Sequence, residues 1–456
     1  MNGLPQAVLV RRGAYHDSVT LMRVSRALSD LPGVAAAMVA MATELNVSIL
    51  LELGFSVPET DPGDLLIAVR ATDTEATIEA AIEEADRQLT AARPQDDAPT
   101  DQPPLTTRSA ALRGRADLVL VSTPGEYAFF EALDAIEAGL PVMIFSDGVS
   151  LERERHLKER AEAKGILVMG PDCGTAVIGG VGLGFANVLT PGPVGVVAAS
   201  GTGAQQVTSL LDWAGVGVSH VLGVGGRDLS AEVGGLSARR ALRLLDDDPA
   251  TELIVLVSKP PAPEVARALE AEPLRTPVVR ALLGAGAPDL TEATERVLRT
   301  LGRPVPEWPS WPGGRHGRAA SGKVKTIKGL YAGGTLCLEA AAVAGTGDFA
   351  DYGDDAYTRG RAHPMIDPTL RVEALGRAQE TDVVLMDVVL GHGADPDPAA
   401  SLVHAVARTP ATVVIALIGT AGDPQDLHRQ ATAFREAGAA VFASNAQAAR
   451  HARSLL

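Results

Sequence analysis

Two distant stretches of the chain share one pattern, in which an apolar strand runs into a glycine-rich turn that starts a helix. The stretches read VVAASGTG at 196–203 and GLYAGGT at 329–335. Each is followed later by a second apolar strand that ends in a Gly/Pro turn, ELIVLVSKPPAP at 252–263 and VVLMDVVLGHGADPDP at 383–398. Short apolar strands that alternate with helical segments are typical of parallel sheets covered by helices. The loose repeat therefore predicts two similar α/β units.

The amino-acid composition fits this fold class. Hydrophobic residues make up 46% of the chain and aromatic residues only 4%, while glycine (47) and proline (30) are frequent. Cores of small aliphatic side chains, punctuated by glycine turns, suit parallel sheets. The sequence predicts a multi-domain α/β protein.

The charge balance limits the kinds of partner. With 40 basic and 56 acidic residues the formal net charge is −16, which argues against nucleic acid and anionic membranes because both require a basic surface. We find no signal-peptide core, and the longest apolar run, 34–42, is too short for a membrane helix. Two cysteines exclude a disulfide framework and a cysteine-based zinc site, and the nine histidines show no metal spacing. We expect a soluble cytoplasmic protein without a metal site, in which local geometry must hold any anionic ligand against an unfavourable overall field.

The strand and helix patterns divide the chain into four modules joined by two linkers. Polar, proline-rich stretches at 94–107 and 303–322 are expected to be linkers because they can bury little. The modules are predicted at 1–93, 108–190, 191–302 and 323–456. The expected strands of the first module, a mixed α/β or α+β domain, are 7–10, 33–41 and 65–71. Those of the second module are 117–122, 142–145 and 166–169.

The glycine-rich turns are the strongest candidates for a binding site. They lie where strands end and helices begin, and in open α/β sheets ligands bind at that edge. Free backbone N–H groups and about half a positive charge at a helix start favour phosphate or carboxylate. The candidate anion-binding residues are Ser200, Gly201, Thr202, Gly203, Gly333, Gly334, Thr335, Gly391 and Gly393. Each turn taken alone could equally be an ordinary strand-to-helix connection, but the same design occurs in both repeats.

Four further residues could serve such a site. Lys259 follows an apolar strand and could neutralise an anion, and His392 lies on a candidate turn and could act as a general acid. Asp172 and Cys173, in the tight turn GPDCGT at 170–175, are expected at the same ligand edge. The alternatives are a surface lysine, an exposed loop histidine and a small packing cysteine.

Nucleotide and hydrolase motifs are missing. The segment 201–206 reads GTGAQQ, so the third glycine of a dinucleotide-binding loop is replaced, and no P-loop lysine motif occurs. Ser200 is not part of a G-x-S-x-G elbow. The sequence therefore predicts neither an orthodox nucleotide site nor a serine hydrolase.

Several long motifs resemble succinyl-CoA synthetase. The second and third modules resemble its α subunit, through STPGEYAFFEALDAIEAGLPVMIFSDGVS (122–150), GPDCGTAVIGG (170–180) and VGVVAASGTGAQQVTSLLDWAGVGVSHVLGVGG (194–226). The fourth resembles the carboxy-terminal ligase domain of its β subunit, through YAGGTLCLEAA (331–341), HPMIDPTLRVEAL (363–375) and DVVLMDVVLGHGADPDPAASLV (382–403). The opening AYHDSVTLMRVS (14–25) is similar to the FdrA family, whose members fuse these parts in this order.

The resemblance implies an architecture and a site. It implies an N-terminal α+β domain, a truncated Rossmann-like domain of the CoA-binding type at 108–190, and two flavodoxin-like ligase domains at 191–302 and 323–456. In the synthetase, helix N-termini of both subunits point at the phosphate of a phosphohistidine. The matching positions here are 200–202 and 391–395, which agrees with the anion site expected from the turns.

The chain also departs from the synthetase. The segment that would carry the phosphohistidine, VVRALLGAGAPDLTEATE at 278–295, contains no histidine. The turn that would hold its orienting glutamate reads Ser-Lys-Pro-Pro at 258–261, so Lys259 could take the place of that glutamate. The first strand and glycine-rich loop of the CoA-binding domain are missing, and nothing resembles the domain that supplies nucleotide. An autonomous ATP-dependent ligase is therefore not expected, and CoA remains only a possible ligand.

The family resemblance implies carbamoyl transfer instead. FdrA proteins resemble components of a multi-subunit oxamate carbamoyltransferase of purine and allantoin nitrogen catabolism, so phosphate and carbamoyl phosphate are the expected ligands and other subunits the expected partners, in a homo- or hetero-oligomer. Exchange of a carbamoyl group with phosphate needs a phosphate site but no nucleotide, CoA or covalent histidine. Two alternatives stay open: an acyl-CoA ligase whose partner supplies nucleotide, and a non-catalytic anion-binding scaffold.

Overall fold

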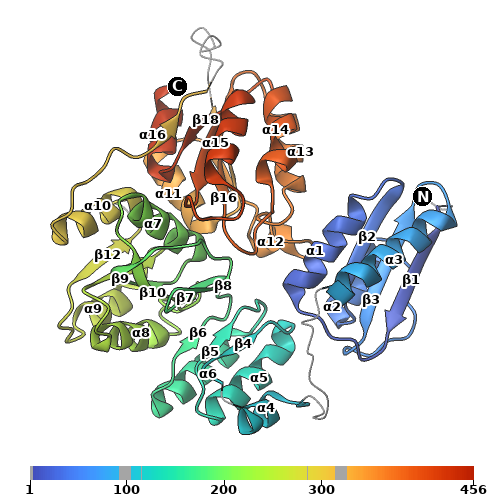
Figure 1. Cartoon of the computed structure of the whole chain (residues 1–456), viewed down its shortest axis with the longest axis horizontal. Coiled ribbons are helices and arrows are strands. Elements are labelled where there is room, and N and C mark those ends of the chain that lie inside the picture. The colour runs from blue at the N-terminus through green and yellow to red at the C-terminus, as the bar shows by residue number, and fades with distance from the viewer. Residues whose placement is uncertain (1–3, 92–103, 115, 285, 314–325) are drawn as a thin grey trace. The chain divides into compact units, whose positions relative to one another are not determined.

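The computed structural model describes residues 4–91, 104–114, 116–284, 286–313 and 326–456 (Figure 1). The chain divides into two compact units. The first comprises 1–104, 122–124 and 358–362, and the second comprises the remaining residues. In the described part of the chain, every helix is too short or too polar to cross a membrane.

The first unit is built on a small antiparallel sheet. Its strands β1 (Gln6–Arg11), β3 (Leu65–Ala71) and β2 (Val34–Met41) lie in the order β1-β3-β2, and its helices are α1 (Ser18–Ser29), α2 (Glu44–Glu52) and α3 (Glu75–Ala91). Alternate residues of β3 face opposite sides. Leu65 and Ile67 pack with α1 and α3, whereas Leu66 packs with Leu50 of α2. The predicted strand positions are confirmed, and the antiparallel pairing makes this an α+β unit.

The second unit begins with a small parallel sheet. Strands β4 (Val119–Val121), β5 (Val142–Ile144) and β6 (Val168–Met169) pair in that order, with helices α4 (Thr107–Arg113), α5 (Gly125–Glu137) and α6 (Leu151–Lys164). Two helices that follow consecutive parallel strands give the expected Rossmann-like arrangement, shortened to three strands. Helix α4 already begins at Thr107, capped by Thr106, so it starts inside the stretch predicted as a linker. Most of that linker, 94–103, lies outside the described residues.

A six-stranded sheet follows. Its strands are β7 (Thr175–Ile178), β8 (Val181–Gly184), β9 (Pro191–Ala198), β10 (Val218–Gly223), β11 (Leu253–Ser258) and β12 (Val278–Leu282), in the order β12-β11-β9-β10-β7-β8. Its helices are α7 (Gly201–Trp213), α8 (Leu236–Asp247), α9 (Pro263–Glu270) and α10 (Leu290–Thr300).

The predicted module boundary at 190 does not coincide with the edge of this sheet. β7 and β8 form a hairpin whose turn, Gly179–Gly180, has positive φ at both residues, as a tight two-residue turn requires. β7 pairs antiparallel with β10, so the hairpin belongs to the third module rather than to the second. The hairpin itself had a local signal in the Gly-Gly turn, but its place in this sheet depends on β10, from a later part of the chain.

A second six-stranded sheet ends the unit. Its strands are β13 (Ser310–Trp311), β14 (Thr326–Tyr331), β15 (Asp348–Asp351), β16 (Asp382–Val389), β17 (Thr412–Ile418) and β18 (Ala440–Phe442), in the order β13-β18-β17-β16-β14-β15. Its helices are α11 (Gly334–Ala344), α12 (Asp355–Thr358), α13 (Thr369–Arg377), α14 (Pro398–Arg408), α15 (Leu427–Glu436) and α16 (Asn445–Ser454).

The stretch predicted as the second linker, 303–322, also contributes to this sheet. β13 pairs antiparallel with β18, and the ring of Trp311 lies 6.4 Å from that of Trp213. The packing of Trp311 against Trp213 of α7 explains why this part of the proline-rich segment has a defined structure. Residues 314–322 lie outside the described part.

Both large sheets have flavodoxin-like strand order. The five parallel strands β15-β14-β16-β17-β18 follow the order 2-1-3-4-5, and β10-β9-β11-β12 follow the order 2-1-3-4. The predicted repeat of two α/β units is thereby confirmed.

Buried polar side chains join the two flavodoxin-like halves. Gln206 of α7 accepts the backbone N–H of Asn445 at 2.8 Å, and the Asn445 amide donates to Glu339 at 2.7 Å. Glu339 also accepts the N–H of Leu290 at 2.6 Å. Burial raises the pKa of Glu339 to about 7, against the lowering effect of these two donors. These buried hydrogen bonds therefore connect the two flavodoxin-like halves within one chain.

Candidate functional site

The predicted glycine-rich turns lie where strand order reverses. In each flavodoxin-like half the first and third strands, β9 with β11 and β14 with β16, are neighbours whose connecting helices leave from the same edge. Ser200 and Lys259 follow β9 and β11, while Gly333 and Gly391 follow β14 and β16. Such switch points are where open α/β sheets bind ligands.

The start of α7 presents free backbone donors. Ser200 is the N-cap residue, and its hydroxyl accepts the N–H of Gly203 at 3.0 Å. The N–H groups of Gly201 and Thr202 have no partner within the described part of the chain. A Cβ on Gly201 would lie 2.9 Å from the hydroxyl of Thr175, so the backbone here closely approaches a second polar group. The positive end of the α7 dipole is therefore open to an anion.

The start of α11 differs in one respect. The Asp387 carboxylate, on β16, accepts the N–H groups of Ala332 at 2.7 Å and Gly333 at 3.0 Å. Gly333 was predicted as an anion donor, but its N–H is already bonded. The next two N–H groups, of Gly334 and Thr335, have no partner among the residues that the structure describes.

The two helix starts meet. A Cβ on Gly203 would lie 3.1 Å from the Thr335 methyl group, and one on Gly333 would overlap the Thr202 side chain. The residues that contribute, which we name the α7–α11 site, are Thr175, Ser200, Gly201, Thr202, Gly203, Gly333, Gly334 and Thr335.

Three threonine hydroxyl groups of the α7–α11 site have no hydrogen-bond partner among the described residues. Thr335 is only 2% exposed and Thr175 only 5%, and within the described residues neither hydroxyl forms a hydrogen bond, nor does that of Thr202. Within the described residues, these three hydroxyls and the four unpaired backbone N–H groups are hydrogen-bonding groups that a polar ligand could use.

Lys259 and Asp351 lie at the first residue of α11. A Cβ on Gly334 would lie 2.8 Å from Lys259 Nζ and would overlap Asp351 Oδ2. Burial raises the pKa of Asp351, while the N–H of Gly353, at 3.0 Å, and the nearby Lys259 ammonium lower it. The structure thus brings the predicted cation to the predicted anion site, together with a carboxylate.

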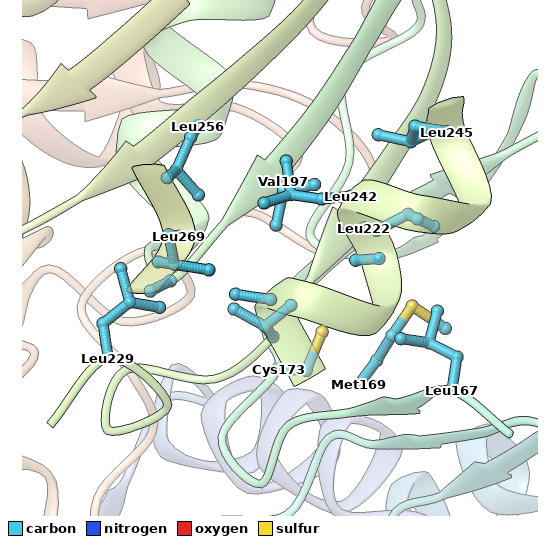
Figure 2. Packing of buried hydrophobic residues seen from close by; sticks show 14 of the residues in the cluster. Leu167, Met169, Cys173, Val197, Leu222, Leu229, Leu242, Leu245, Leu256 and Leu269 are labelled. Atoms are coloured by element: carbon cyan, nitrogen blue, oxygen red, sulfur yellow. The ribbon is translucent and has the colours of Figure 1, made fainter. Parts of the chain in front are cut away.

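Of the two residues expected in the 170–175 turn, only Asp172 is exposed. Loss of solvent around the carboxylate raises the pKa of Asp172 to about 6, and the negative charges of Asp147 and Asp355 add to the rise. The positive charges of Arg227 and Lys259 lower it in part. Cys173 was expected at the ligand edge, but its side chain packs in the apolar core beside Met169 and Leu242 (Figure 2). Cys173 is 2% exposed and its thiol donates to the carbonyl of Thr175 at 3.6 Å, so it is a packing residue, which corrects the expectation.

The buried thiols should be unreactive. Burial raises the pKa of both Cys173 and Cys337 to about 12, so the thiolate forms only toward that pH and is scarce at neutral pH. At about pH 8 we expect the native protein to react with Ellman's reagent at least about 100-fold more slowly than a small thiol. In concentrated guanidinium both cysteines should react at the ordinary rate. Rapid labelling of Cys173 in the native state would contradict this assignment.

The turn at Gly391 offers fewer amides to an anion than predicted. The N–H of Gly391 donates to Gln425 at 3.1 Å, and the N–H of His392 donates to the carbonyl of Ala186 at 2.8 Å. The turn is thus bonded to the segment between β8 and β9, because a bridge pairs Ala186 with His392 in both directions. The amides of Gly391 and His392 are therefore not available to an anion. The exposed His392 side chain keeps its role as a general acid only as a prediction, and Gly393 packs against Phe185.

Sequence reasoning missed three residues of this region. Thr175 ends the GPDCGT turn but was not singled out there, and Asp351 belongs to no motif; the order of the strands brings both to the helix starts. Asp387 had a readable signal, since it is a lone carboxylate within the apolar strand VVLMDVVL and such a residue must find partners.

Two family models match parts of the chain. One, described as "AllF, heavy metal-associated domain", matches residues 4–104, and another, described as "CoA-ligase", matches residues 330–455. The first match does not bring a thiolate metal site with it, because residues 4–104 contain no cysteine. The match indicates that the N-terminal domain is similar to the heavy metal-associated domain of AllF.

Relatives match the chain at two levels. It is 34% identical to the uncharacterized protein YahF of Escherichia coli (strain K12), covering 98% of each chain. It is 28% identical over 158 residues to succinate–CoA ligase [ADP-forming] subunit alpha 2 of Archaeoglobus fulgidus, or 34% of this chain and 54% of that subunit. Among solved structures, one match is the dinucleotide forming acetyl-coenzyme A synthetase 1 of Ca. Korarchaeum cryptofilum, in complex with phosphate and ADP. The match covers 75% of this chain and 82% of that chain, with a TM-score of 0.30 and 16% identity. The full-length match places the whole chain in one family of fused proteins.

Proposed function

This chain belongs to the FdrA family of fused, succinyl-CoA-synthetase-like proteins, and from that premise we propose that it binds phosphate or an acyl phosphate at the α7–α11 site and acts in carbamoyl transfer. One observation carries the proposal: two helix N-termini with unpaired N–H groups meet beside Lys259. Together two helix starts contribute roughly one positive charge. A chain with a net charge of −16 can thus hold an anion through local geometry.

The proposed reaction is a reversible exchange of a carbamoyl group with phosphate. A phosphate oxygen attacks the carbamoyl carbon of N-carbamoyloxamate, the C–N bond breaks, and oxamate leaves with a proton while carbamoyl phosphate forms. Negative charge develops on the carbamoyl oxygen, where preorganised N–H donors are most effective. The reaction requires no phosphohistidine, which fits a 278–295 segment that has no histidine.

Release of phosphate tests the proposal. The purified protein, alone and together with the products of neighbouring genes, is incubated with carbamoyl phosphate and oxamate, and phosphate is followed without added nucleotide. Oxamate-dependent release above the spontaneous rate is the expected result. Activity that instead requires ATP and CoA and yields a thioester would overturn carbamoyl transfer.

Gly201→Asp is the sharpest variant for the α7–α11 site. It places a carboxylate at the first residue of α7, where repulsion of a bound anion at about 4 Å is on the order of 4 kcal/mol for an effective dielectric near 20. We expect phosphate affinity to fall more than 100-fold in calorimetry. An acidic residue in the first turn favours the helix, but its Cβ would lie 2.9 Å from the Thr175 hydroxyl, so any loss of thermal stability should be matched by Gly201→Asn.

Gly201→Asn is the matched control for this variant. It adds a side chain of the same size near Thr175 but no charge, so its loss of phosphate affinity should be much smaller. If both variants bind phosphate like the unsubstituted protein, the α7–α11 site is not where the anion binds, and a non-catalytic scaffold becomes the better explanation.

The matches to ligases favour a second candidate. Residues 330–455 match a CoA-ligase model, and part of the chain is similar to a succinate–CoA ligase subunit. In that case the α7–α11 site would bind the acyl phosphate of an acyl-CoA synthesis, with a partner supplying nucleotide. Thioester formation that depends on ATP and CoA, in the assay above, is the result that would select it.

A further inference from the structure

Asp351 places a hydrogen-bond acceptor beside Gly334, in the proposed α7–α11 site. It ends β15, and its backbone pairs with Tyr331 of β14, three residues before the first residue of α11. Its Oδ1 accepts the N–H of Gly353 at 3.0 Å. Its Oδ2 lies against Gly334 and forms no hydrogen bond within the described residues.

A carboxylate is unexpected beside helix N-termini that are proposed to bind phosphate. An ionised carboxylate accepts hydrogen bonds but cannot donate them, so it repels the phosphate that the helix starts attract. Lys259, at the same residue of α11, offsets part of that repulsion. The Thr335 side chain is 2% exposed, and its hydroxyl forms no hydrogen bond in the described chain, so it adds a free polar group to the same helix start. A ligand that carries an N–H donor next to its anionic group would satisfy both the helix starts and Asp351.

We propose that Asp351 is a specificity-determining residue that accepts a hydrogen bond from the amide –NH2 of the carbamoyl group, so that the site selects carbamoyl phosphate over acetyl phosphate. The two ligands are nearly the same size and differ in an –NH2 in place of a –CH3. A site built to hydrogen-bond an N–H group rejects the analogue that lacks it, because the buried acceptor is then left unpaired. This inference rests on the proposed function and adds the residue by which the site recognises the carbamoyl group.

Two stable phosphonates test the inference on the full-length protein. Phosphonoacetamide carries the –NH2 group, and 2-oxopropylphosphonate carries –CH3 in its place. In calorimetry we expect the first to bind at least about 10-fold more tightly than the second. Asp351→Ala should abolish this preference while leaving affinity for inorganic phosphate unchanged or raised, since a negative charge is removed. Asp351→Asn, which keeps a carbonyl acceptor, should retain part of the preference.

Asp348→Ala is the control, because Asp348 is an exposed aspartate at the other end of the same strand. It should change neither affinity. If the unsubstituted protein binds phosphate but does not distinguish the two phosphonates, or if Asp351→Ala keeps the preference, the role of Asp351 is wrong. If inorganic phosphate itself does not bind, the proposed phosphate site fails instead.

Discussion

Replacing Lys158 with methionine is expected to lower the free energy of unfolding by about 3–5 kcal/mol, because the change leaves the buried Asp228 carboxylate without its cation and leaves Glu154 paired with Arg227 alone. The Lys158 side chain, on α6, is 1% exposed. Its ammonium group donates to Glu154 and Asp228, each at 2.8 Å, and to the carbonyl of Val224 at 3.0 Å. Asp228 also accepts two N–H groups at the start of α8, so the lysine links the Rossmann-like sheet to the first flavodoxin-like half.

Urea unfolding followed by circular dichroism measures this effect, with a control on the same helix. Arg155 forms an ion pair with Glu159 at 2.7 Å, but its side chain is 60% exposed. Because exposed ion pairs contribute little, Arg155→Met should change stability by less than about 1 kcal/mol. Adding Asp228→Asn to Lys158→Met should recover part of the loss, since the unpaired charge is then removed. Equal unfolding curves for Lys158→Met and Arg155→Met would show that the buried ion pairs are not required.

The main strands of the flavodoxin-like halves could be predicted because each is an apolar run bounded by glycine or proline. Strand β11 and strand β16 are buried along their whole lengths, and the sequence shows them as continuous hydrophobic segments. The β7–β8 hairpin and β13 could not be predicted in the same way. The hairpin has a local signal, Gly-Gly between two short apolar segments, but its place in the sheet depends on β10, later in the chain. β13 is two residues long and pairs with β18, far along the chain, and local pattern carries no information about that pairing.

The candidate site was predictable to a similar degree. The turns at Ser200 and Gly333 carry a local signal, since a glycine-rich turn before a helix exposes backbone donors. Whether a donor is free depends on contacts from elsewhere: Asp387 occupies the N–H of Gly333, and Ala186 occupies that of His392. For the same reason Asp351 was not foreseen, because strand order alone places it beside Gly334.

Asp387→Asn should be comparably damaging, both to the fold and to the α7–α11 site. Asp387 is fully buried, and its carboxylate accepts two backbone N–H groups and the guanidinium of Arg371 at 3.1 Å. Arg371 is itself buried, and its other bonds go to carbonyl oxygens of Asp387 and Pro364. Asparagine removes the charge that balances the guanidinium and offers only one acceptor oxygen. We expect a loss of about 3–5 kcal/mol in the free energy of unfolding.

Asp387→Asn can also show whether Asp387 supports only the fold or also the geometry of the α7–α11 site. Asp397→Asn is the matched control, since Asp397 pairs with Arg429 at 3.0 Å in an exposed position and asparagine still caps α14. Adding Arg371→Met to Asp387→Asn should restore much of the lost stability, because neither charge then remains buried. Phosphate affinity should stay low in that double variant, since the Ala332–Gly333 turn that leads into α11 still lacks its second acceptor. Restored stability with restored affinity would mean that Asp387 supports the fold alone. Low affinity in a stable protein is the result that would tie this carboxylate to the geometry of the anion site.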